Sequence, residues 1–176
     1  MVIKKRGYFF TLDAVLGLFI IVIGVFLITP SYISVPQPTQ VGLLSDDLLN
    51  FLSNTKIKNL NNPYAGIGGD LWSQGIITDA DNSLLQQTGE FYATNKLDIA
   101  DKFISNVTQG VMPQQFRYEV WMNGIILYPK TQSAEHISSR TNTDLLLTSK
   151  KITFGVINAT SNIWGPYKAE VYVWEK

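Results

Sequence analysis

The order of apolar and polar residues divides the chain into three parts. The first is an unbroken apolar run from Tyr8 to Ile28, and Thr11 and Asp13 are the polar residues inside it. Between residues 41 and 107 apolar residues recur at helical spacing, and from residue 114 onward they alternate with polar ones. The pattern predicts an α+β fold: a long N-terminal hydrophobic helix, a helical region and a C-terminal antiparallel sheet of about four strands.

The first run is long enough to predict a membrane-crossing helix. Its 21 residues would rise roughly 30 Å, the thickness of a bilayer's hydrocarbon core. Lys4, Lys5 and Arg6 precede the run, and no basic residue follows it before Lys56. The positive-inside rule then makes the N-terminus cytoplasmic and the later chain extracytoplasmic. We therefore expect a transmembrane helix over residues 8–29 that anchors an outer domain.

A cleaved secretory signal peptide is the alternative to a retained helix. The apolar region of such a signal normally spans about 7–15 residues and ends at a small-x-small cleavage site. Here the apolar run continues to Ile28 and leaves through Thr29-Pro30-Ser31-Tyr32, which contains no such pair. The length and the exit sequence favour retention.

Asp13 is a carboxylate in apolar surroundings, where a polar group is costly and calls for a partner. One interpretation is that Asp13 pairs with a cation on a neighbouring chain, such as the amine created by cleavage after Gly7. The other is that its side chain reaches the lipid headgroups. Gly17 and Gly24, seven residues apart, lie on nearly one helix face and would permit close helix approach, although glycine is also common in membrane helices.

This arrangement of basic residues, Gly7, aromatic residues, Thr11-Leu12, an acid and a long apolar run resembles the class III signal of type IV pilins, pseudopilins and their archaeal relatives. The resemblance implies that a prepilin peptidase removes leader 1–7 on the cytoplasmic side and leaves Tyr8 as the new N-terminus. It also implies a pilin-like fold and a retained apolar segment that packs with other subunits in the core of a surface filament.

Three prolines, Pro30, Pro36 and Pro38, mark residues 30–40 as a linker, because proline interrupts helices and favours extended chain. The alternative is a helix that continues through a kink at Pro30. Residues 41–176 remain as one extracytoplasmic α+β domain. Its predicted helical part consists of a helix Val41–Leu52, a loop 56–69, a short strand or turn 70–77, and a helix 82–107 that Gly89 would bend or divide before Gly110 and Pro113 end it.

The stretch Asp79-Ala80-Asp81-Asn82-Ser83 has alternating oxygen ligands of the kind that bind calcium. It lacks the later glycine and the final glutamate of an EF-hand loop. Asp81 or Asn82 as the N-cap of the following helix is the simpler interpretation.

Alternation predicts the sheet. Residues 116–122 and 125–128 flank Asn123-Gly124, which is the strongest short hairpin signal. A polar loop, 131–143, separates the hairpin from a strand at 145–157. A turn at 162–166 then leads to a last strand, Lys168–Trp174, with Ala169, Val171 and Val173 on one face and Glu170, Tyr172 and Trp174 on the other.

Composition argues against several classes of function. Beyond the N-terminal segment the acidic residues outnumber the basic ones by two, so the basic face of a nucleic-acid-binding protein is missing. The chain has no cysteine and hence no disulfide or thiolate metal site.

Catalytic patterns are weak. His136 is the only histidine, and although Glu135, Ser138 and Ser139 are near it in sequence, neighbours along a loop rarely form a triad. Gly66-Ile67-Gly68-Gly69 lacks the lysine of a phosphate-binding loop. We expect His136 in an exposed loop, and no catalytic, metal or cofactor site.

Asn106-Val107-Thr108 and Asn158-Ala159-Thr160 are N-glycosylation sequons, which suit an outer domain. The sequence as a whole favours a major or minor subunit of a type IV pilus-like filament, whose partners are other subunits, the membrane and prepilin peptidase. A membrane-anchored binding or secretion-accessory module that does not polymerise is the alternative, and an anchored enzyme is a third possibility.

Overall fold

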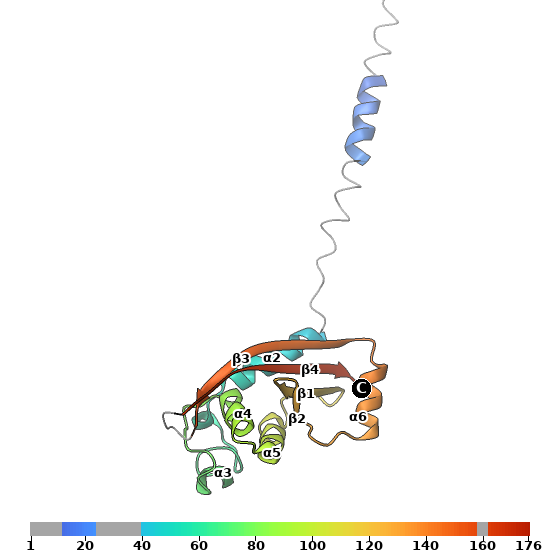
Figure 1. Cartoon of the computed structure of the whole chain (residues 1–176). Helices are drawn as coiled ribbons and strands as arrows, with labels where there is room; N and C mark the ends of the chain where they lie inside the picture. Colours follow the sequence, from blue (N-terminus) through green and yellow to red (C-terminus); the bar gives the residue numbers. More distant parts are fainter. Residues whose placement is uncertain (1–11, 24–39, 158–161) are drawn as a thin grey trace, which may run out of the picture. The chain divides into compact units, whose positions relative to one another are not determined.

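The computed structural model describes residues 12–23, 40–157 and 162–176 (Figure 1). The chain divides into two units, Met1–Gln37 and Pro38–Lys176. The first contains one described helix, residues 12–23, here called the N-terminal helix. The second is a folded α+β unit with its own hydrophobic core.

The predicted membrane-crossing helix over residues 8–29 is wrong. The first helix begins at residue 12, and its described part ends at residue 23. The twelve helical residues that the structure describes account for a rise of about 18 Å, which is less than a bilayer's hydrocarbon core. Within the described ranges no helix combines the length and the apolarity needed to cross a membrane. The prediction equated an apolar run with a helix, whereas Asp13 belongs to the first turn, where a carboxylate favours helix initiation through the helix dipole.

The folded unit is built on a four-stranded antiparallel sheet of order β2-β1-β4-β3. The strands are β1 Phe116–Met122, β2 Ile125–Tyr128, β3 Leu146–Val156 and β4 Ile163–Glu175. Asn123 and Gly124 both have positive φ, +48° and +82°, as a tight two-residue hairpin requires. The predicted sheet and its first hairpin are therefore confirmed.

The predicted turn at 162–166 is wrong, because residues 163–166 already belong to β4. Trp164 pairs with Gly155, and Ile163 pairs with Val156. The register shifts at Thr153/Gly155, and Gly165 across from this point has φ +89°. Glycine and proline here mark an irregularity within a strand rather than a chain reversal.

Three helices cover one face of the sheet (Figure 1): α2 Gln40–Asn54, α4 Leu84–Ala93 and α5 Leu97–Thr108. The predicted helix at 41–52 is confirmed as α2. The predicted helix at 82–107 is two helices, which was the open alternative, but the break lies at Asn95 (φ +56°) and not at Gly89. Two short helices, η1 Ile57–Asn59 and α3 Asp70–Ser73, occupy the α2–α4 connection, so 70–77 begins as a helical turn rather than a strand.

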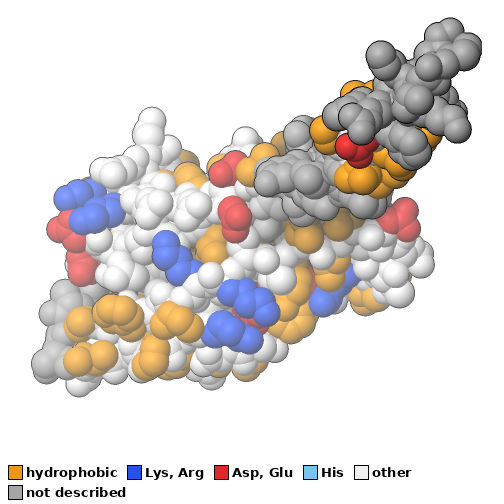
Figure 2. All heavy atoms as spheres, turned by 90° about the horizontal axis from the view of Figure 1, so that it is seen from above, with side chains coloured by type: hydrophobic (Ala, Val, Ile, Leu, Met, Phe, Trp, Pro, Cys, Tyr) orange, Lys and Arg blue, Asp and Glu red, His pale blue; other side chains and the backbone are white. Residues whose placement is uncertain are grey.

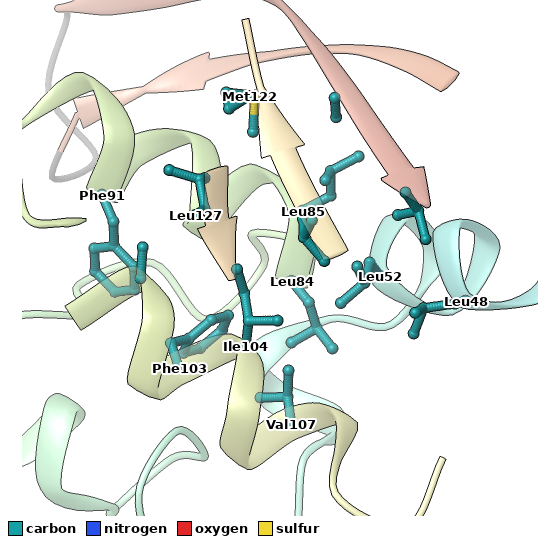
Figure 3. Close-up of a cluster of buried hydrophobic side chains, with 14 of the residues drawn as sticks. Leu48, Leu52, Leu84, Leu85, Phe91, Phe103, Ile104, Val107, Met122 and Leu127 are labelled. Carbon is teal, nitrogen blue, oxygen red and sulfur yellow. The ribbon is translucent and has the colours of Figure 1, made fainter. Parts of the chain in front are cut away.

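The core lies between these helices and the sheet (Figure 3). Leu48 and Leu52 of α2 meet Phe103 and Ile104 of α5 there, together with Val120 of β1, and none of the five is more than 1% exposed. Phe91 and Phe103 pack edge to face, with ring centroids 5.4 Å apart. Burial of this apolar stripe stabilises helices that would be marginal alone.

Ser83 caps α4, one or two residues beyond the predicted cap. Its hydroxyl accepts from the backbone N–H of Gln86, and the Gln86 side chain accepts from the backbone N–H of Ser83. This reciprocal pair is a capping box. Asp81 instead accepts from Lys56 and Lys58, at 3.2 and 2.6 Å.

The predicted polar loop at 131–143 is also wrong, because it contains helix α6, Ala134–Asn142. Ser133 caps α6 by accepting from the backbone N–H of His136. The helix lies at the end of the sheet that also holds the C-terminus (Figure 1). His136 is buried there rather than exposed.

Candidate functional site

The sequence-predicted site residues fall into two groups. The leader residues Lys4, Lys5, Arg6, Gly7 and Tyr8, together with Gly24 and Asn158, lie outside the described residues. The other three, Asp13, Gly17 and Asn106, lie in helices.

The N-terminal helix exposes apolar side chains on every side. Nine large ones are between 46% and 69% exposed: Leu12, Val15, Leu16, Leu18, Phe19, Ile20, Ile21, Val22 and Ile23. Asp13 is the second helical residue, and a Cβ placed on Gly17 would meet no atom within 4 Å. A helix that is apolar all round is normally buried, so this surface requires partners.

Asn106 lies near the end of α5 and is half-buried. Its side-chain amide donates to the carbonyl of Lys102 at 2.8 Å. Thr108, the third residue of the sequon, is buried and donates to the carbonyl of Ile104. Both sequon side chains are thus engaged within the folded helix.

A buried carboxylate that the sequence reasoning missed lies on the sheet face opposite the core. Glu119 of β1 is fully buried, and its Oε1 accepts from Gln132 Nε2 at 2.7 Å and from His136 Nε2 at 3.1 Å. Its Oε2 accepts from Trp121 Nε1 at 2.8 Å and from Arg140 Nη1 at 3.1 Å. Four donors from β1, α6 and the loop before α6 therefore compensate its desolvation.

Aromatic rings enclose this cluster. The Arg140 guanidinium lies over the rings of Trp121 and Tyr172, at 5.3 and 5.7 Å. His136 packs edge-on against Trp174, whose indole N–H donates to Ser139 Oγ at 3.0 Å. The cluster fastens α6 to the sheet and covers the end of this outer face.

The arrangement does not form a catalytic triad within the described residues. The bond from His136 Nε2 goes to Glu119, and Ser139 is engaged with the Trp174 indole and with the carbonyl of His136. No serine hydroxyl bonded to the imidazole occurs in the described parts, whereas a triad needs that contact. The geometry is that of a structural polar network.

A hollow of about 290 Å³ adjoins the cluster and is lined partly by Arg117, Tyr118, Tyr128 and His136. Arg117 forms an ion pair with the exposed Glu135. Burial raises the pKa of Tyr118 above its ordinary value of 10.0, so its hydroxyl stays protonated and bonds Thr108 Oγ1 at 2.5 Å.

Three charged residues occupy the middle of the outer face. Glu170 accepts from Lys150 at 3.0 Å and from Lys168 at 3.1 Å. Burial by itself raises the pKa of Glu170, but the two lysine bonds outweigh it, and the pKa lies below its ordinary value of 4.5. The same bond raises the pKa of Lys150.

The far end of the outer face is apolar, and no other described element of the chain covers it. Ile152, Phe154 and Val156 follow one another on one face of β3, and Ile163 is the β4 partner of Val156. Their exposed fractions are 60%, 63%, 37% and 77%. We call these four residues the apolar strip; Figure 2 shows hydrophobic side chains gathered at this end, with charged ones beside them.

Metal ligation has no support in the described parts of the chain, where no three potential ligands come together. The carboxylates of the calcium alternative at Asp79–Ser83 have protein partners instead. Asp79 accepts from the backbone N–H of Asp81, and Asp81 pairs with two lysines.

Comparison of the chain with protein-family models, with curated proteins and with solved structures finds no match in any of the three.

Proposed function

We propose that the chain is a structural subunit of a type IV pilin-like surface filament. The leader ending at Gly7 is removed, and the apolar N-terminal segment then packs with the same segment of other subunits. The observation that carries the proposal is the joining, in one chain, of the Lys4-Lys5-Arg6-Gly7 motif, a helix that is apolar on all sides and a separate folded unit.

The exposure of the N-terminal helix supports assembly. Nine large apolar side chains exposed on one helix exceed what single soluble proteins normally leave in water. Packing copies of this helix side by side would bury each of them, and Gly17 would allow close approach. Asp13 in the first turn would lie near the new amine of Tyr8, on its own chain or on a neighbour, and opposite charges there would attract.

The folded unit supports a surface role of the binding or structural kind rather than catalysis. The most deeply buried carboxylate of its outer face, Glu119, is bonded to structural partners on β1, α6 and the loop before α6. Its stability needs no disulfide, because its core is continuous from α2 to β4. We place this unit on the cell surface, with prepilin peptidase and other filament subunits as partners.

The test is intact-mass measurement of the protein purified from its host, combined with electron microscopy of surface filaments. The expected result is loss of Met1–Gly7 and presence of the chain in filaments. Gly7→Val should block both, whereas Val2→Ala in the same leader should leave both unchanged. Normal maturation of Gly7→Val would contradict the proposal, and cleavage without filaments would favour an anchored module that does not polymerise.

A further inference from the structure

The two ends of the sheet's outer face differ in what covers them. At one end α6 covers Trp174 and the Glu119 cluster. At the other end the apolar strip has no covering element within the described residues, although its four side chains are as apolar as those buried elsewhere. A patch of this kind, on the order of 400 Å², equals the largest patches of monomeric proteins, which are often binding surfaces.

Basic residues border the strip. Lys168 is the direct β4 partner of Ile152, and Lys150 lies two residues before Ile152 on the same face of β3. Lys150 and Lys168 share the single carboxylate of Glu170, so this border has a positive excess. A partner surface should therefore combine apolar side chains with acidic ones.

The α6 end of the same chain has that combination. A hollow of about 360 Å³ is lined there by Asp144, Leu145 and Glu175, together with Ser139, Asn142, Thr143 and Lys176. Leu145 and Leu146 are 37% and 38% exposed, and Ile137 on α6 is 49% exposed. We call this surface the acidic hollow. Its described lining contains two carboxylate side chains and one lysine, so the acidic side chains are in excess.

The strip and the hollow are too far apart to meet within one molecule. Leu146 begins β3 and Val156 ends it, a separation of about 33 Å at 3.3 Å per residue. A surface at one end that fits a surface at the other end makes a head-to-tail contact. Repetition of such a contact builds an open filament, whereas a strip-to-strip contact closes as a dimer.

We propose that the apolar strip of one copy docks in the acidic hollow of the next copy. The proposal rests on the filament function above and adds to it the face through which folded units meet. Phe154 and Ile163, the most exposed members of the strip, enter the hollow against Leu145, while Lys150 and Lys168 approach Asp144 and Glu175. Contact through the strand edge is disfavoured, because Lys151 on that edge strand opposes pairing with another strand.

Cysteine cross-linking tests the contact, since the natural chain has no cysteine. Full-length Ile163→Cys and Leu145→Cys proteins are mixed in a mild detergent and oxidised. The mixture should give at least about ten times as much disulfide dimer as either variant alone, because docking raises the local concentration of the paired thiols. Ile125→Cys, exposed on β2, replaces either partner as the matched control and should give only the background level.

Two results would overturn the inference: equal cross-linking in the mixture and the control, or a stronger dimer from Ile163→Cys alone, which indicates a strip-to-strip contact. A second variant adds Phe154→Asp to the Ile163→Cys protein. This addition should abolish the cross-link to the Leu145→Cys protein, whereas adding Ile125→Asp instead should leave the cross-link intact.

Leader removal separates this inference from the filament function. Filaments of mature protein without the strip-to-hollow cross-link would reject the docking and keep the function. A cross-link in protein that retains Met1–Gly7 in its host would reject the function and keep the docking.

Discussion

The indole of Trp164 lies directly against Gly89, so that a Cβ at Gly89 would overlap the six-membered ring. The ring also lies against Gly155, where a Cβ would come within 2.7 Å of Cζ2. Trp164 is only 4% exposed, and Tyr167 stacks on it at 5.5 Å. Two glycines from α4 and β3 thus make the slot that holds the indole and joins helix to sheet.

Gly89→Ala should destabilise the folded unit, although alanine favours a helix by about 1 kcal/mol over glycine. The added methyl group displaces a rigid, buried ring, and overpacking of this kind costs about 1–3 kcal/mol. We expect a lower free energy of unfolding in urea, measured by tryptophan fluorescence on the full-length protein in a mild detergent.

The control for Gly89→Ala is the double variant with Trp164→Leu. Removing the ring removes the clash, so the loss in the double variant should be smaller than the sum of the two single losses. Additive losses, or a stabilised Gly89→Ala protein, would show that the slot does not constrain this position.

Glu119→Ala should cost about 3–5 kcal/mol, because it leaves Arg140 without its counter-charge and the other three side chains of the network without their buried partner. Glu135→Gln on α6 removes a carboxylate that is 81% exposed and should change the free energy of unfolding by less than about 1 kcal/mol. The signal to follow is near-UV circular dichroism, since Trp121 and Trp174 pack against the cluster. Equal effects of the two substitutions would contradict the buried network.

Stability should depend on pH through Glu170, whose pKa is lower in the folded unit than its ordinary value of 4.5. The stabilisation is present above that value and is lost as the pH falls through the folded pKa. Glu170→Gln should therefore cost about 1 kcal/mol near pH 7, and its difference from the natural protein should shrink as the pH falls below about 4.5. Asp47→Asn, at an exposed position of α2, is the control and should show no such dependence on pH. A difference in free energy of unfolding between Glu170→Gln and the natural protein that grows toward acid pH would contradict the prediction.

Ser83→Ala should lower the free energy of unfolding by about 1 kcal/mol, because the backbone N–H of Gln86 loses its acceptor. Ser105→Ala, at an exposed position within α5, should differ from the natural protein by at most about 0.5 kcal/mol. Amide hydrogen exchange at the start of α4 gives a local readout, and unchanged protection of Gln86 would argue against the cap.

The candidate surfaces were only partly predictable from the sequence. Alternation placed Glu119 on the same face as Arg117 and Trp121, but it carried no sign that Gln132, His136 and Arg140 would meet that carboxylate. The low apolar content of 131–143 indicated a loop, whereas Ser133 as a cap and the Glu119 contacts make α6 a helix. The apolar members of the strip were visible as strand residues, but their exposure was not.

By itself the sequence determined the class of the fold, helix α2, the Asn123-Gly124 hairpin and the alternation of β4, because these depend on periods and turn residues within a few positions of one another. It also carries the basic leader and the apolar run on which the filament proposal depends. Only the tertiary structure decided that His136 is buried, that Gly89 accommodates Trp164, and which end of the sheet no other described element covers. The burial of His136 and the packing of Trp164 against Gly89 depend on partners 17 and 75 residues away along the chain, and no local pattern records which distant side chain will fill a given space.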